Sequence, residues 1–70
     1  MIKIKDAFTD ELVEVKVGDY VCFKCDVEQS GKITDITGEL LTLSSEHGFS
    51  GHYIGGSHVT TERASDCWVE

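Results

Sequence analysis

Three cysteines and three histidines are the residues of this chain whose side chains most readily bind metal ions or act as nucleophiles and bases. A pair of cysteines separated by two residues, with histidines and a further cysteine downstream, is a pattern typical of zinc sites. The set here is Cys22, Cys25, Cys67, His47, His52 and His58. On a regular strand, however, Cys22 and Cys25 would point to opposite faces. We therefore expect no cofactor and interpret Cys22 and Cys67 as small buried residues, with Cys22, Cys25 and Cys67 as the candidate ligands of a zinc-bound alternative.

Nucleophilic catalysis would need a cysteine or serine beside a histidine base. Cys67 or a serine could pair with one of the histidines, but no G-x-S-x-G or comparable signature accompanies them. A redox role for the cysteine pair would need a helix N-terminus that lowers a thiol pKa. A chain of 70 residues also has too small a core to preorganise an elaborate active site. We expect a protein without enzyme activity.

The charge balance restricts the class of partner. Thirteen acidic residues against six basic ones give a formal net charge of −7. Phosphate backbones are bound by clustered Lys and Arg, whereas the basic residues here are scattered, so we expect no direct nucleic-acid binding and an attraction to basic surfaces. No apolar run approaches the ~20 residues of a membrane span. The N-terminus has no apolar signal segment, which predicts a cytoplasmic protein with reduced cysteines.

The apolar residues alternate with a period of two, which predicts strands. The predicted strands cover residues 2–5, 12–17, 20–26, 31–36, 40–44, 57–62 and 66–69. Single helical turns are expected only at residues 10–12 and 64–66. Because so short a chain supplies one small core, we predict a single domain spanning residues 1–70.

Short, evenly spaced strands with glycines at the corners are typical of a small barrel. We predict an all-β, strongly bent antiparallel barrel of five to six strands, with an N-terminal strand pair over one edge. The predicted core consists of Ile4, Val15, Val21, Phe23, Ile33, Ile36, Leu41, Leu43, Val59, Trp68 and Val69. Trp68 is expected to anchor the last strand. A homodimer stays an alternative, because exposed edge strands can pair with those of a second copy.

Residues 15–70 also carry a family resemblance. A Gly-Asp corner at Gly18, a G-K-I-x-x-I hairpin from Gly31 and an L-x-L return at Leu41 resemble the SH3-like small barrels, including KOW-type modules. The segments VGDYVCFKCDVEQSGKI, LLTLSSEHGFSGHYIGG and DCWVE are similar to very small proteins of tailed bacteriophages without an assigned function. The resemblance implies an SH3-like barrel made in the cytoplasm of an infected cell, and it carries no catalytic residues. The chain lacks the basic surface of ribosomal KOW modules, so RNA binding is not implied.

The longest irregular stretch, residues 45–57, holds four glycines around Phe49, His52 and Tyr53. Loops on a rigid scaffold are where recognition residues gather. We predict partner contacts through these three residues, with Asp26 and Glu28 as an acidic rim that steers association. The alternative is that Phe49 or Tyr53 plugs an open end of the barrel.

These observations predict a non-catalytic binding module, a small phage accessory protein that covers a surface of a host or phage protein. Two alternatives stay open. An acidic nucleic-acid mimic would occupy a basic groove and compete with DNA or RNA. A zinc-stabilised module would contain stoichiometric metal.

Overall fold

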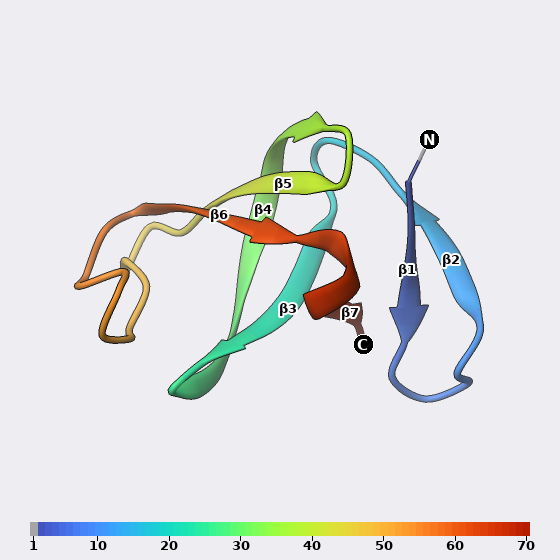
Figure 1. Cartoon of the computed structure of the whole chain (residues 1–70), viewed down its shortest axis with the longest axis horizontal. Helices are drawn as coiled ribbons and strands as arrows, with labels where there is room; N and C mark the ends of the chain where they lie inside the picture. The colour runs from blue at the N-terminus through green and yellow to red at the C-terminus, as the bar shows by residue number, and fades with distance from the viewer. Residues whose placement is uncertain (1) are drawn as a thin grey trace.

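The structure, a computed structural model, describes residues 2–70 as seven strands and one short 3₁₀ helix (Figure 1). The elements are β1 (Ile2–Asp6), β2 (Leu12–Val15), β3 (Tyr20–Cys25), β4 (Val27–Thr37), β5 (Leu40–Ser44), β6 (Val59–Arg63), η1 (Ala64–Asp66) and β7 (Trp68–Val69). All seven predicted strands and the 3₁₀ turn at residues 64–66 are confirmed. The helical turn predicted at residues 10–12 is wrong, because Asp10 has a φ of 62° and β2 begins at Leu12.

The strands form one sheet in the order β2-β1-β7-β3-β4-β5-β6. The β1–β7 pair is parallel and the other pairs are antiparallel. The sheet therefore differs from the predicted antiparallel barrel of five to six strands: it is mixed, has seven strands, and within residues 2–70 its edge strands β2 and β6 do not pair. The physical reason is β7, in which Trp68 pairs with Lys5 on one side and Cys22 on the other, so that the N-terminal hairpin extends the sheet.

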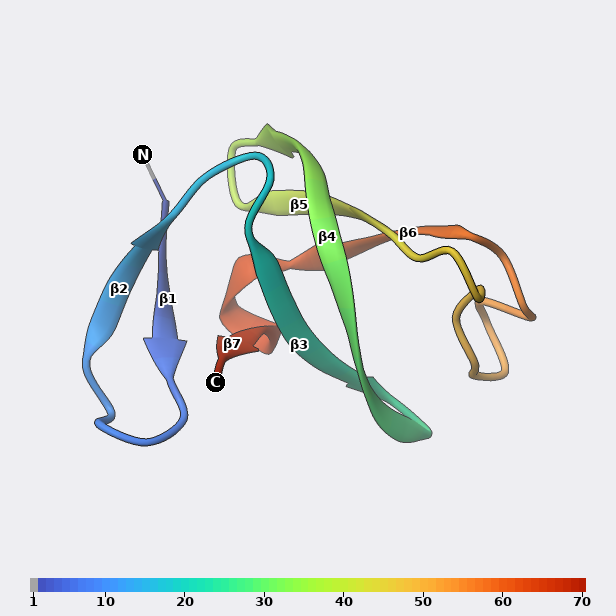
Figure 2. The ribbon, with the colours of Figure 1, turned by 180° about the vertical axis from the view of Figure 1, so that it is seen from behind.

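The long strand β4 bends the sheet. Its first half pairs with β3 and its second half with β5, and the register shifts between Ile33 and Asp35. This bulge lets both Ile33 and Ile36 face the interior although they are three residues apart. Figures 1 and 2 show the result, in which β5 and β6 cross the β3–β4 hairpin and the N-terminal hairpin lies at the opposite end from residues 45–58.

The core lies on the inner side of this bent sheet. Of the predicted core, Ile4, Val15, Val21, Phe23, Ile33, Leu41 and Leu43 are buried, and Ile36 and Val69 are partly buried against them. The prediction for Val59 is wrong: it is 53% exposed because its partner in the register, Ser44, faces outward. Trp68 is half-buried rather than central. Four further core residues are Cys25, Phe49, Ala64 and Cys67. Of these, Cys67 was expected to be buried, and burial of Phe49 was the alternative left open.

Candidate functional site

The 45–58 loop, defined as residues 45–58 between β5 and β6, is folded onto the open end of the core. Phe49 is 1% exposed, and its ring lies edge-to-face with that of Phe23 at a centroid distance of 5.4 Å. A Cβ at Gly31 would lie 2.7 Å from Cζ of Phe49, so the absence of a side chain at position 31 makes room for the ring. Phe49 therefore plugs the core, as the alternative left open by the sequence expects, and its ring is not at the surface.

Hydrogen bonds fasten the 45–58 loop to the tip of the β3–β4 hairpin. The side-chain amide of Gln29 donates to the Ser50 carbonyl (2.7 Å) and accepts from the Ser50 N–H (2.9 Å). Asp26, whose φ of 66° turns the hairpin, accepts the N–H of His52 at 3.0 Å. The imidazole Nδ1 of His52 lies 3.2 Å from the same carboxylate. The structure thus brings the predicted residues Asp26 and His52 together, where they contact each other.

Tyr53 reaches back to the inner face of β6. Its hydroxyl donates to Glu62 at 3.0 Å from Oε1, and the Thr60 hydroxyl donates to Oε2 of the same carboxylate at 2.7 Å. Burial of the hydroxyl, together with its contacts to Cys25 and Glu62, raises the pKa of Tyr53, so that it keeps its proton and acts as a donor. The ring itself remains 58% exposed. Tyr53 is therefore a surface residue whose polar end has a structural partner.

Sequence reasoning missed Glu62, which is only 8% exposed. Glu62 pairs with Leu41 and Thr60 pairs with Leu43, so the two buried polar residues of β6 share the face of buried leucines. Among residues 2–70, every buried side-chain N or O atom has a hydrogen-bond partner. The spacing of Thr60 and Glu62 could have indicated that they lie on the same side of the sheet, since residues two apart on a strand share a face.

The opposite side of β7, β3, β4 and β5, which we call the outer face, carries two aromatic residues. Tyr20 is 66% exposed and pairs with Lys32. Trp68 pairs with Cys22, which in turn pairs with Ser30, so that small side chains lie beside the indole. Directly paired residues project to the same side of a sheet. Strand register thus places Tyr20 and Trp68 on one face.

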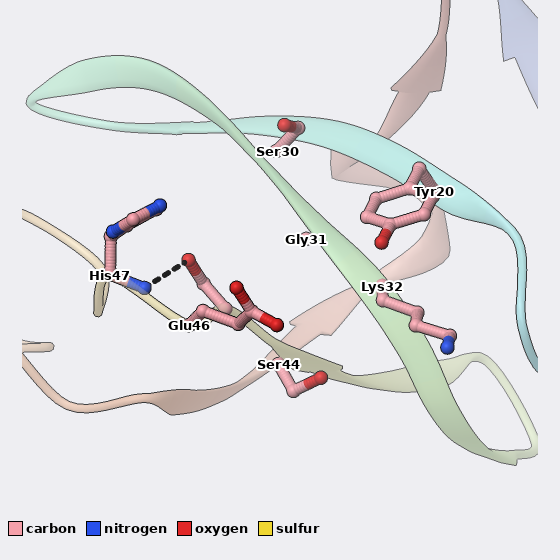
Figure 3. Close-up of a pocket in the computed structure, with 8 residues that line it drawn as sticks. Tyr20, Ser30, Gly31, Lys32, Ser44, Glu46 and His47 are labelled. Atoms are coloured by element: carbon pink, nitrogen blue, oxygen red, sulfur yellow. Dashed lines mark hydrogen bonds between the residues drawn. The ribbon is translucent and has the colours of Figure 1, made fainter.

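Two of the hollows on the outer face share Ser30. The first has a volume of about 410 Å³ and is lined by Tyr20, Ser30, Gly31, Lys32, Ser44, Ser45, Glu46 and His47. Figure 3 shows the Tyr20 ring at one end of this hollow and the imidazole of His47 at the other, with Gly31 between them. The second has a volume of about 270 Å³ and is lined by Cys22, Glu28, Gln29, Ser30, Trp68 and Glu70. Together they form a polar-lined depression with one aromatic residue in each half.

Charged side chains of both signs surround Trp68, which pairs with Lys5 and shares a hollow with Lys5 and Glu28. Its indole N–H donates to Glu70 at 3.0 Å, and Glu28 also lines the second hollow. Burial raises the pKa of the Cys22 thiol, and the charges of Glu70 and Glu28 raise it further. The predicted acidic rim is therefore divided, with Glu28 on the outer face and Asp26 at the hairpin tip beneath the 45–58 loop.

The structure separates the three candidate metal ligands proposed from sequence. Cys22 is half-buried on the outer face, whereas Cys25 and Cys67 are buried in the core. Burial also raises the pKa of the Cys67 thiol to about 12. Within residues 2–70, one group of three potential ligands has donor atoms within 4.8 Å of one another, and it consists of Cys25, Asp26 and His52.

Comparison of the chain with protein-family models, with curated proteins and with solved structures gives no match. In the part of the chain that the structure describes, no helix is long and apolar enough to cross a membrane. The function is therefore inferred from the geometry of the chain itself.

Proposed function

We propose that the protein is a non-catalytic binding module whose partner docks on the outer face. The observation that carries this proposal is the placement of Tyr20 and Trp68 beside two hollows that meet at Ser30. Aromatic residues that border depressions with small side chains are the usual anchors of protein interfaces. Tyr20 is largely exposed, so a partner that covers it would bury apolar area that now faces water.

The excess of negative charge favours a partner with a basic surface. Glu28 and Glu70 line the hollow beside Trp68, whereas Glu46 and Lys32 both line the one beside Tyr20. The net charge of −7 would attract a basic partner over a longer range and speed its association. The resemblance to small tailed-bacteriophage proteins supports a host or phage protein as this partner, met in the host cytoplasm.

The state of two thiols supports a role without nucleophilic catalysis. The thiolate is the reactive form of cysteine. The pKa of Cys67 is raised to about 12 by burial and by nearby carboxylates, and that of Cys22 is raised in the same way. Both therefore stay protonated at neutral pH and are poor nucleophiles.

We further propose an SH3-like arrangement of β3 to β7, to which β1 and β2 add an edge. Two features support it. The strand β7 follows a 3₁₀ turn and returns to pair with β3, the first strand of this set. The strand β4 takes part in two successive hairpins and bends between them. Such a sheet would hold the outer face rigid, which lowers the cost of ordering on binding.

The test starts with capture of the partner from a bacterial host lysate on the tagged protein, followed by calorimetry with the purified partner. Tyr20→Ala and Trp68→Ala should each weaken binding by more than about 1 kcal/mol, roughly fivefold in Kd. The matched control is Phe8→Ala, since Phe8 is an aromatic residue that is 81% exposed and lies outside both hollows. Circular dichroism confirms that each variant is folded.

The same experiment separates the proposal from its rivals. Binding that is unchanged in both outer-face variants would overturn it. A partner displaced by DNA, with an affinity that falls steeply with salt, would identify an acidic nucleic-acid mimic instead. Capture of only a second copy of the chain would identify a homodimer.

A further inference from the structure

We propose that Cys25, Asp26 and His52 bind a transition-metal ion of the Zn²⁺ class at the junction of the β3–β4 hairpin and the 45–58 loop. The thiol sulfur, a carboxylate oxygen and an imidazole nitrogen lie within 4.8 Å of one another. Ligand atoms around a tetrahedral zinc ion are about 3.3–3.8 Å apart, given metal–ligand distances of about 2.0–2.3 Å. Movements of roughly an ångström would close the three donors on an ion. This site is independent of the proposed docking surface.

The backbone explains why residues from distant parts of the chain meet here. Gly51 lies directly against Cys25, because a Cβ at position 51 would overlap Sγ of Cys25. Its φ of 127° is a conformation that favours glycine. Asp26 follows Cys25 and His52 follows Gly51, so this single close contact brings a carboxylate and an imidazole beside the buried thiol.

The donors are already held in place. The carboxylate of Asp26 accepts the backbone N–H of His52 at 3.0 Å, and its other oxygen lies 3.2 Å from Nδ1 of the imidazole. Gln29 adds its two hydrogen bonds to Ser50 in the same loop. An ion would therefore have little chain to order, and ordering is the main cost of assembling a site from separate segments.

The donor set selects the class of metal. A thiolate and an imidazole favour Zn²⁺ and similar ions over Mg²⁺ and Ca²⁺, which prefer sites made of oxygen ligands. Three protein ligands leave a fourth position for water, and the side chains of His52 and Asp26 are 78% and 56% exposed, so an ion can enter from solvent. Sequence reasoning included Cys25 and His52 among six possible zinc ligands but not Asp26, and only the fold brings these three residues together.

The test is a titration of the isolated, reduced and chelator-treated protein with Co²⁺ and with Zn²⁺. The expected result is one equivalent of Co²⁺ with the near-ultraviolet charge-transfer band of a cobalt–thiolate bond, displaced by Zn²⁺, and a rise in Tm with Zn²⁺. Cys25→Ser should abolish the band. Because even an outer-shell change costs 10–100-fold in metal affinity, His52→Ala, which removes an exposed ligand, should weaken binding by at least roughly tenfold.

Cys22→Ser and His47→Ala are the matched controls and should bind as the parent does. The proposal is overturned if the parent shows neither the cobalt–thiolate band nor a shift in Tm with Zn²⁺. It is also overturned if Cys22→Ser rather than Cys25→Ser removes the band, or if His52→Ala binds as tightly as the parent. His52 is exposed, so its variant keeps the test decisive should Cys25→Ser fail to fold. The measurement needs no partner, and its failure would leave the docking proposal untouched.

Discussion

The 45–58 loop and the outer face both carry aromatic side chains, but they use them differently. In the loop, Phe49 is buried against Phe23, and the hydroxyl of Tyr53 is bound to Glu62. On the outer face, Tyr20 is 66% exposed and Trp68 stands beside a hollow. An irregular, glycine-rich segment is thus a structural plug here, whereas regular strands carry the aromatic residues that we propose as the docking surface. In this protein the register of the strands, rather than the irregularity of the backbone, determines which aromatic side chains are exposed.

The largest expected effect comes from removing the plug. Phe49→Ala should cost about 3–5 kcal/mol, since it leaves a cavity beneath the loop. That is comparable with the whole stability expected of so small a domain, so most of the protein should be unfolded. Urea denaturation followed by circular dichroism measures the loss. Trp68→Ala changes a half-buried residue and should lower the free energy of unfolding clearly less. Equal losses in the two variants would contradict the assignment of Phe49 to the core and Trp68 to the outer face.

A second change tests the fit of the plug from the opposite side. Gly31→Ala puts a methyl group where the Phe49 ring lies, at 2.7 Å from Cζ, and overpacking of this kind costs about 1–3 kcal/mol. The neighbouring substitution Ser30→Ala adds no volume to the core and should change the free energy of unfolding by less than about 0.5 kcal/mol. If Gly31→Ala is as stable as Ser30→Ala, Phe49 does not pack against β4 as described.

The smallest expected effect concerns the polar end of Tyr53. Tyr53→Phe removes one hydrogen bond to a carboxylate that keeps Thr60 as a partner, and should cost about 0.5–1.5 kcal/mol. The pKa of Tyr53 is raised in the folded protein, so its contribution is present below its unfolded pKa near 10.0 and is lost as the pH rises through the folded value. Urea denaturation should therefore show the parent as more stable than Tyr53→Phe at neutral pH, and the difference in free energy of unfolding should shrink at alkaline pH. A difference that persists at high pH would contradict this contact.

The sequence predicts the local elements better than their assembly. Alternation located all seven strands, but β4 begins at Val27 rather than near position 31. The reason is that the residues after Val27 are polar and Asp26 turns the hairpin without a glycine. The parallel β1–β7 pair joins the two ends of the chain, and nothing in a local pattern indicates it. It changes the predicted barrel into an extended mixed sheet.

The candidate site was less predictable for the same reason. Phe49 is buried by Phe23 and by the space at Gly31, both far from it in sequence. Trp68 was expected in the core as the anchor of the last strand, yet pairing with Cys22 places it on the outer face. Glu28 was chosen for its charge, and register puts it beside Trp68. Residue type indicated which side chains mattered, and only long-range pairing decided where each one lies.

The most direct test of the proposed docking surface is a ¹⁵N–¹H NMR titration of the labelled protein with its purified partner. The docking proposal predicts that the amide shifts concentrate in residues 20–22, 28–32 and 68–70, which carry the outer face. Signals of residues 48–54 should move little, since that part of the loop closes the core. Shifts centred on residues 48–54, with the outer face unperturbed, would contradict the central claim and return the binding site to the loop.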